Sequence, residues 1–264
     1  MLLHGWTATA ALNWATCFAP LGRHFRVLAI DHRGHGRGVR PLPLRGFHLG
    51  DCADDVVAMA DALDVERIVP VGYSMGGPIA QLTWRRHPDR VAGLVLCATS
   101  RNFRGTTQRH MGQLALTGGV AGAAAALRTL PSPVRRQLST VGLGWRRRNI
   151  GLPDWAVEEV VRNDPAALLD GFGALQRFNS AAWIGSVDVP TAVIVTTHDN
   201  VVPPDRQRKL AESIPGARVW PVAGDHAVCI SDPAVFVPAL IDACRWVLSR
   251  APTTVGGARQ GPAS

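Results

Sequence analysis

Long apolar segments are missing from this sequence. Its 264 residues contain no run of about 18 or more uninterrupted apolar residues, which is the length that a helix needs to cross a bilayer. The N-terminus also lacks the succession of basic, apolar and small residues that forms a secretory signal. Hydrophobic residues make up 47% of the chain, which is ample for a core. We therefore expect a globular, cytoplasmic protein.

Cysteine is scarce, and its spacing matches neither a disulfide framework nor a zinc site. The five cysteines are odd in number, widely spread and without C-x-x-C spacing. Both kinds of site need even-numbered or closely spaced cysteines. We therefore predict buried thiols for most of them. The cysteines are Cys17, Cys52, Cys97, Cys229 and Cys244.

Lysine is almost absent, since Lys209 is the single lysine among 28 basic residues. The net charge of +8 therefore rests on arginines that are dispersed along the chain, and no nucleic-acid recognition motif accompanies them. A basic run from Arg146 to Arg148 is typical of a solvated face. We expect no nucleic-acid partner, and the sequence gives no support for membrane association.

The sequence does contain an alternation of short β-branched runs with longer helical patterns. Such an alternation is typical of a mostly parallel sheet with flanking helices. Apolar residues recur every three or four positions between Leu49 and Leu63, as in an amphipathic helix. The predicted fold class is therefore α/β. The predicted strands are Arg26–Ile30, Arg67–Val71, Val91–Cys97, Thr191–Thr196 and Ala217–Val222.

The alternation stops in a long middle region, where Ala, Gly and Arg dominate and prolines interrupt the pattern. No convincing strand occurs there, so we predict a helical insertion between two strands. Its clearest helices are expected at Leu114–Leu130 and Asp154–Asn163. The predicted organisation is a core at residues 1–99 and 187–250, a helical cap at 100–186, and a disordered tail rich in Gly, Pro and Thr at 251–264.

A five-residue motif, Gly72-Tyr73-Ser74-Met75-Gly76, directly follows a predicted strand and precedes a helical pattern from about Gly77 to His87. A sharp turn from strand to helix exposes its central side chain at the edge of the sheet, and glycines on both sides give it room. The alternative is a Gly-rich turn with an idle serine. The setting between strand and helix favours Ser74 as a nucleophile.

A serine hydroxyl is a weak nucleophile and needs a base that is oriented by an acid. Asp199 follows the predicted strand Thr191–Thr196, and His226 follows the predicted strand Ala217–Val222. The carboxyl ends of parallel strands meet at one edge of the sheet, so both side chains can converge on Ser74. We predict Asp199 as the acid and His226 as the base.

Four neighbouring residues are alternatives to this pair. His198 is adjacent to Asp199, and Asp225 is adjacent to His226, so each could take its neighbour's role. Asp205 and Asp232 are weaker candidates for the acid, because each lies at the start of a helical pattern near a proline and is expected to cap it.

The tetrahedral intermediate of serine attack carries an oxyanion, which backbone N–H donors stabilise by about 3 kcal/mol each. The N–H of Met75, next to the nucleophile, is one candidate. The second is the N–H of Trp6, in the loop that follows the short apolar run Leu2-Leu3. His4 is expected to stabilise this turn.

Four motifs in this order resemble those of the α/β-hydrolase superfamily, over about residues 1 to 250. They are His4-Gly5-Trp6, Asp31-His32-Arg33-Gly34-His35-Gly36, the Ser74 motif, and the pair Asp199 and His226. The resemblance implies an eight-stranded sheet, a helical cap, and the roles proposed above for the three residues. The chain is most similar to the lipase, esterase, lactonase and cofactor-free haloperoxidase group, which implies that no metal or organic cofactor is needed.

The sequence departs from the family pattern at two places. Asp225 precedes His226 where the family more often has glycine, which adds a competing carboxylate beside the base. Related chains also have two strands and most of a third before the His-Gly turn, whereas this chain starts at Met1-Leu2-Leu3. We hypothesise that Met1 is an internal start and that the natural protein extends upstream. The first strands are then missing, and the remaining stub is expected to pair over only three or four residues.

The resemblance implies hydrolysis of a carboxylic ester, or of a lactone or thioester, through an acyl-enzyme at Ser74. The expected partner is a small-molecule ester or acyl compound. Alternatives are acyl transfer or a haloperoxidase-like reaction on the same residues, or a non-catalytic binding protein that keeps the fold. Trp145, Trp155 and Trp183 are candidates for lining a pocket, with helix packing as the other interpretation.

Overall fold

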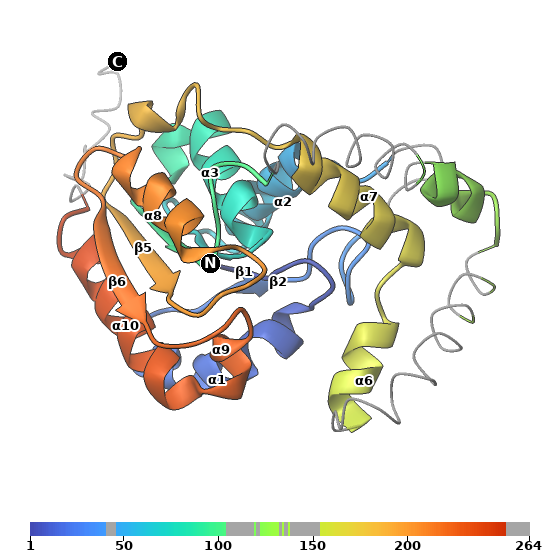
Figure 1. Cartoon of the computed structure of the whole chain (residues 1–264), viewed down its shortest axis with the longest axis horizontal. Helices are drawn as coiled ribbons and strands as arrows, with labels where there is room; N and C mark the ends of the chain where they lie inside the picture. The colour runs from blue at the N-terminus through green and yellow to red at the C-terminus, as the bar shows by residue number, and fades with distance from the viewer. Residues whose placement is uncertain are drawn as a thin grey trace, which may run out of the picture.

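The computed structural model describes residues 1–40, 46–103, 119, 122–131, 134, 137 and 154–251. Within these residues, six strands form one parallel sheet in the order β2-β1-β3-β4-β5-β6 (Figure 1). The predicted α/β class with a mostly parallel sheet is therefore confirmed. The strands are β1 Leu2–Leu3, β2 Ala29–Ile30, β3 Val71–Tyr73, β4 Leu94–Cys97, β5 Thr191–Thr196 and β6 Arg218–Val222.

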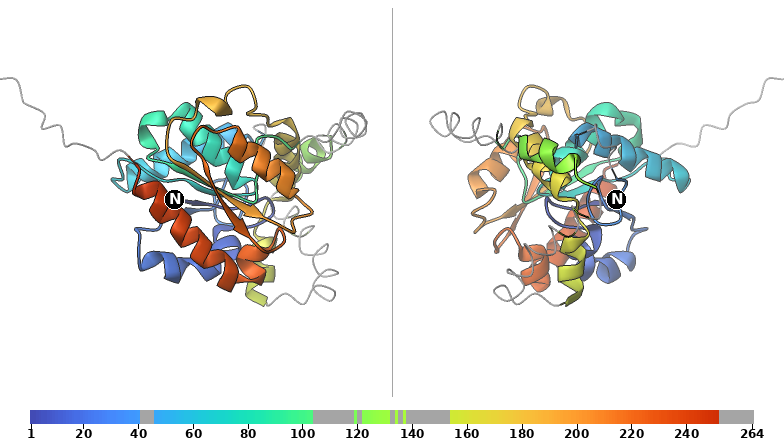
Figure 2. Two further views of the ribbon diagram at one scale, coloured as in Figure 1. Left: turned by 60° about the vertical axis from the view of Figure 1, so that its left-hand side comes forward. Right: turned by 90° about the vertical axis from the view of Figure 1, so that its right-hand side faces the viewer.

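Helices cover both faces of the sheet. Helices α2, α3 and α8 pack on one face, and α1, α9 and α10 pack on the other (Figures 1 and 2). Every connection crosses from one strand to the next through a helical segment, as parallel pairing requires. The helices are α1 Ala10–Gly22, α2 Leu49–Ala62, α3 Gly76–Arg86, η1 Pro88–Arg90, α6 Asp154–Val161, α7 Pro165–Arg177, η2 Ile184–Ser186, α8 Pro204–Glu212, α9 Val228–Ser231 and α10 Pro233–Leu248.

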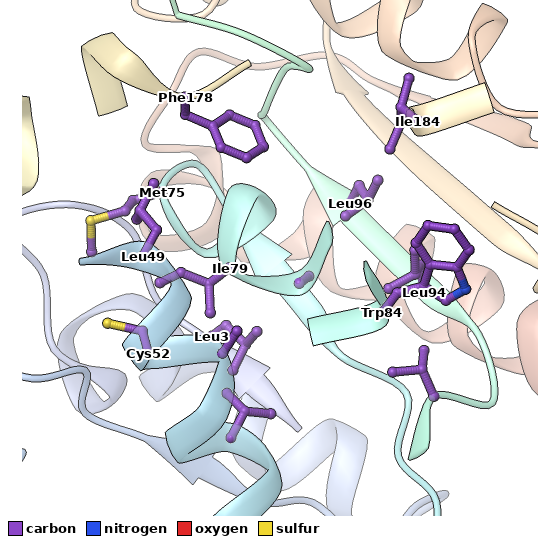
Figure 3. Close-up of a cluster of buried hydrophobic side chains, with 14 of the residues drawn as sticks. Leu3, Leu49, Cys52, Met75, Ile79, Trp84, Leu94, Leu96, Phe178 and Ile184 are labelled. Atoms are coloured by element: carbon purple, nitrogen blue, oxygen red, sulfur yellow. The ribbon is translucent and has the colours of Figure 1, made fainter. Parts of the chain in front are cut away.

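The hydrophobic core is divided by the sheet into two clusters. Successive side chains of a strand point to opposite faces, so Leu94 and Leu96 of β4 join one cluster while Val95 and Cys97 join the other. Strands β4 and β5 are buried along their whole length, as expected for the interior of a parallel sheet. The residues labelled in Figure 3 from the first cluster are Leu3, Leu49, Cys52, Met75, Ile79, Trp84, Leu94, Leu96, Phe178 and Ile184.

Four of the five predicted strands differ from their predicted bounds, namely β2, β3, β4 and β6. Strand β1 pairs with β2 and with β3 over two residues each, fewer than the three or four expected. Because β2 has only β1 as its neighbour, it is limited to Ala29–Ile30, whereas β3 also pairs with β4 and spans Val71–Tyr73. Strand β6 forms one edge of the sheet, and most of its residues are exposed. The described residues form six strands, fewer than the eight that the resemblance implies.

The predicted insertion at residues 100–186 contributes helices α6 and α7, and its described part contains no strand. Helix α7 differs from the sequence prediction, in which prolines interrupt the helical pattern of this region. Asp164 instead caps this helix by accepting hydrogen bonds from the N–H groups of Ala166 and Ala167, and Pro165 occupies the first helical position, where a missing N–H costs nothing. Figure 1 shows α6 and α7 to the right of the sheet, where they contact the loops that follow β1 and β2.

Other expectations for the insertion are met only in part. Residues 122–128 of the predicted helix Leu114–Leu130 are helical, and most of its first half lies outside the described residues. Residues 252–264 of the predicted tail and Trp145 also lie outside them. Trp155 is 47% exposed. The ring of Trp183 stacks on Trp84 with centroids 6.3 Å apart, and Trp183 packs against the core as a partly buried residue.

No helix in the described ranges combines the length and the apolar character that crossing a membrane requires. All five cysteines are free and buried, as predicted for thiols without a disulfide framework.

Candidate active site

Ser74 lies at the sharp turn between β3 and α3. Its backbone φ is +51°, in the left-handed region that residues other than glycine rarely adopt. A Cβ atom on Gly72 would overlap the carbonyl of Gly76, and one on Gly76 would overlap the carbonyl of Leu3. The Ser74 N–H donates to the Cys97 carbonyl at 2.9 Å. Close backbone packing therefore holds Ser74 in a strained conformation at the carboxyl edge of the sheet.

His226 and Asp199 converge on Ser74 at this edge. His226 follows β6, and its Nε2 lies 3.0 Å from the Ser74 Oγ. Asp199 follows β5, and its Oδ2 lies 2.7 Å from the His226 Nδ1. The structure thus brings together the three residues that the sequence singled out, although 125 and 27 positions separate them along the chain. Ser74 itself is largely buried, with 9% of its surface exposed.

The carboxylate of Asp199 is buried and well supplied with hydrogen bonds. Its Oδ2 accepts from the Thr196 hydroxyl at 2.8 Å, and its Oδ1 accepts from the N–H groups of Val201 and Val202, each at 2.8 Å. Burial raises the pKa of Asp199, but the hydrogen bond and charge of His226, together with the other donors, hold that pKa below its usual value. Asp199 is therefore ionised at neutral pH.

The four alternative residues lie outside this arrangement. His198 and Asp225 are exposed, and Asp225 accepts a hydrogen bond from the Ala227 N–H at 2.8 Å. Asp205 is exposed in the first turn of α8, and the cap position of that helix is Pro203, so the predicted capping by Asp205 is wrong. Asp232 occupies the cap position of α10 without a hydrogen bond from its side chain, which corrects the predicted capping.

Two residues that the sequence did not single out support the site. The Tyr73 hydroxyl donates to the His226 carbonyl at 2.9 Å. Gln207 of α8 is fully buried, and its Nε2 donates to the Thr196 hydroxyl at 2.8 Å and to the Asp199 Oδ2 at 3.2 Å. Tyr73 occupies a variable position inside the serine motif, and an isolated glutamine in an amphipathic helix gives no sequence signal.

The two candidate donors for an oxyanion lie beside Ser74. Met75 is the next residue and precedes α3. Trp6 lies in the loop after β1, and a Cβ on its neighbour Gly5 would sit 3.4 Å from the Ser74 Cβ. Among the described residues, neither the Met75 N–H nor the Trp6 N–H donates a hydrogen bond to another residue. Both N–H groups are therefore free of other acceptors among the described residues.

No group of three or more His, Cys, Asp and Glu side chains is arranged to hold a metal ion within the part of the chain that the structure describes. His4, His32 and His35 lie close together, but the Nε2 of His4 accepts from the His32 N–H at 3.0 Å, and its Nδ1 faces the Gly5 carbonyl at 2.8 Å. His4 thus stabilises its turn, as expected.

Comparisons with known proteins point to one family. The family model of the α/β hydrolase fold matches residues 1–233. The pimeloyl-acyl-carrier-protein methyl ester esterase of Chromobacterium violaceum is 30% identical over 247 residues, which cover 92% of this chain and 92% of that protein.

Solved structures agree with this assignment. A hydrolase from Pseudomonas aeruginosa is similar with a TM-score of 0.73 and 25% identity, covering 92% of this chain and 88% of that one. The enol-lactonase from Burkholderia xenovorans has a TM-score of 0.72 and 24% identity, covering 92% and 90%. The comparisons confirm both the resemblance and the prediction of a hydrolase. The chain belongs to the α/β hydrolase fold family.

Proposed function

We propose that this protein hydrolyses a carboxylic ester through an acyl-enzyme formed on Ser74. The observation that carries the proposal is the hydrogen-bonded series from Ser74 through His226 to Asp199, with distances of 3.0 and 2.7 Å. A base within hydrogen-bond reach of a hydroxyl, and itself oriented by a carboxylate, is the arrangement that activates a serine nucleophile.

The reaction proceeds in two halves. The Ser74 Oγ attacks the acyl carbon, and its proton passes to the Nε2 of His226. The negative oxygen of the tetrahedral intermediate accepts hydrogen bonds from the N–H groups of Trp6 and Met75. As the intermediate collapses, His226 gives the proton to the departing alcohol, which leaves the acyl group on Ser74. Water then attacks this acyl group with His226 as the base, and the acid departs.

Asp199 supports both halves without changing its protonation. Its carboxylate holds the Nδ1 of His226, which fixes the ring so that Nε2 faces Ser74, and its charge stabilises the imidazolium that forms. These residues complete the reaction without a metal or organic cofactor. The positions of all three at strand ends keep them within reach of the same substrate carbonyl.

The proposed substrate is a small-molecule ester or acyl compound. The relative from Chromobacterium violaceum is named as a methyl ester esterase, which supports an ester over other acyl compounds. A lactone or thioester presents the same carbonyl to Ser74, and acyl transfer or a haloperoxidase-like reaction would use the same residues with another acceptor. Fold alone does not choose among these reactions.

Hydrolysis of short-chain p-nitrophenyl esters by purified protein tests the proposal. We expect turnover by the unchanged protein and a loss of at least about 10³-fold in kcat for Ser74→Ala. Ser231→Ala is the matched control, because Ser231 is an exposed serine at the end of α9. Equal turnover by Ser74→Ala and the control would refute the assignment of the nucleophile. A folded protein that turns over no ester would instead favour the binding protein.

A further inference from the structure

The loop that carries the Trp6 N–H has an unusual backbone. The Gly5 carbonyl accepts a hydrogen bond from the Ala8 N–H at 3.3 Å, so residues 5–8 form a β-turn. Thr7, the third residue of this turn, has a φ of +66°. Glycine or asparagine usually occupies such a position, and a β-branched residue is strained there. Contacts outside the turn must therefore keep Thr7 in this conformation.

Asn163 makes such a contact from the residues that follow α6. Its side chain is 1% exposed, and its Nδ2 donates to the Thr7 carbonyl at 2.9 Å. Its Oδ1 accepts from the Gly36 N–H at 2.8 Å. The buried amide of Asn163 thus donates a hydrogen bond to the strained turn and accepts one from the loop after β2. Asn163 lies 156 positions from Thr7 and 127 positions from Gly36 in sequence, and it holds the two loops together.

Neighbouring contacts tie the same segment to the same loops. Buried Glu159 accepts from the Thr9 hydroxyl at 2.7 Å and pairs with Arg37 at 2.9 Å. The indole N–H of Trp6 donates to the Leu168 carbonyl of α7 at 2.8 Å. Trp6 follows Gly5, which lies next to Ser74, and the insertion fixes both the side chain of Trp6 and the carbonyl of the next residue.

We propose that Asn163 is a positioning residue for the reaction, and that its hydrogen bond to the Thr7 carbonyl holds the turn in which the Trp6 N–H meets the oxyanion. This inference rests on the proposed function. A turn released from Asn163 relaxes toward negative φ at Thr7 and rotates the neighbouring peptide groups. Displacement of a donor by about 1 Å is enough to cost up to about 100-fold in rate.

The variant Asn163→Asp tests the hydrogen bond with little change in shape. Aspartate keeps an acceptor for the Gly36 N–H but presents a second acceptor, in place of a donor, to the Thr7 carbonyl. We expect kcat for p-nitrophenyl ester hydrolysis to fall about 10-fold to 100-fold, with KM changed by less than about 3-fold, because the oxyanion forms only after attack.

The matched control is Glu158→Gln. It replaces a carboxylate with an amide on the same segment, at a side chain that is 71% exposed. We expect this control to keep the kcat of the unchanged protein. If Asn163→Asp does not fold, Asn163→Ala replaces it with the same expected result. A kcat for the folded Asn163 variant equal to that of the control would overturn the proposal.

A second substitution separates positioning from general stability. Thr7 is exposed, and glycine adopts a φ of +66° without strain, so Thr7→Gly should hold the turn when Asn163 no longer does. We expect the double variant Thr7→Gly, Asn163→Asp to regain at least about 3-fold in kcat over Asn163→Asp, while its melting temperature does not recover in parallel. No gain in kcat would contradict the role of Thr7.

The outcome for the unchanged protein separates the two proposals. If it hydrolyses no ester and Ser74 is inert, the proposed function fails. If it is active and the Asn163 variants match the control, only the positioning role of Asn163 fails.

Discussion

At the scale of single residues, Asp199 remains charged in the interior because donors surround both of its oxygens. Its lowered pKa has a definite consequence for stability. The contribution of this carboxylate to the free energy of unfolding is complete above the unfolded pKa of about 3.9, and it is lost only as the pH falls through the lower folded pKa. Asp199 is therefore expected to stay ionised at pH 5 and above.

Asp199→Asn tests the role of this charge. The amide reverses the donor and acceptor pattern at the Nδ1 of His226 and favours the wrong tautomer of the ring, so we expect kcat for ester hydrolysis to fall by about 10³-fold to 10⁴-fold. Asp225→Asn is the matched control, since that carboxylate is exposed and adjacent to His226. If Asp225→Asn caused the larger loss, Asp225 and not Asp199 would be the acid.

The residues of the site were predictable where chain order determines them. Ser74, Asp199 and His226 each follow a strand, and parallel strands place all such positions at one edge. Gln207 and Asn163 were not predictable, because their roles depend on side-chain contacts with loops on other elements. No periodic pattern or motif marks such contacts in a single sequence.

At the scale of elements, the turn from β3 to α3 depends on close approach of backbone to backbone. Gly76→Ala would drive a methyl group into the Leu3 carbonyl, and the strand on which Leu3 lies cannot yield without loss of pairing. We expect the free energy of unfolding to fall by about 1–3 kcal/mol or more, as measured by urea denaturation.

Gly22→Ala is the control for this prediction, because a Cβ on Gly22 at the end of α1 meets nothing within 4 Å. Its free energy of unfolding should be unchanged or slightly raised. Equal stability of the two variants would show that the elbow has room that the structure does not indicate.

The elements themselves were predictable to different degrees. Strand β5 has its predicted bounds, because β4 pairs with its residues 191–194 and β6 with its residues 192–196, so that the two neighbours together cover its whole length. Strand β2 is shorter than predicted, because its neighbour β1 offers only two residues for pairing. The start of helix α7 is marked in the sequence by Asp164-Pro165, a capping residue followed by proline at the first helical position. The prediction of prolines as interruptions of the pattern does not use this mark.

At the scale of the whole molecule, three buried histidines make stability depend on pH. Burial lowers the pKa of His4 to about 4 and that of His35 to about 3, and it lowers the pKa of His32 well below its usual value. The unfolded chain binds these protons near pH 6.5, whereas the folded chain does not. Stability is therefore lost as the pH falls from about 6.5 toward 4.

His35→Phe tests this dependence. His35 already faces the ring of Phe47 with centroids 5.7 Å apart, so an apolar ring suits the site. Between pH 7 and pH 5, we expect the unchanged protein to lose about 1–2 kcal/mol of unfolding free energy for each of the three histidines, and His35→Phe to lose about a third less in total. Urea denaturation at several pH values measures both slopes, with exposed His48→Gln as the control. Identical slopes for His35→Phe and the control would contradict the account.

The central claim is that the chain forms a covalent acyl-enzyme at the strained turn between β3 and α3. Reaction with a fluorophosphonate, followed by mass spectrometry of the intact protein and its peptides, tests it directly. The account predicts one adduct per chain, on the peptide that contains Ser74, with labelling slowed by at least about 10³-fold in His226→Gln. A folded protein that gains no adduct, or that gains one on another serine, would contradict it.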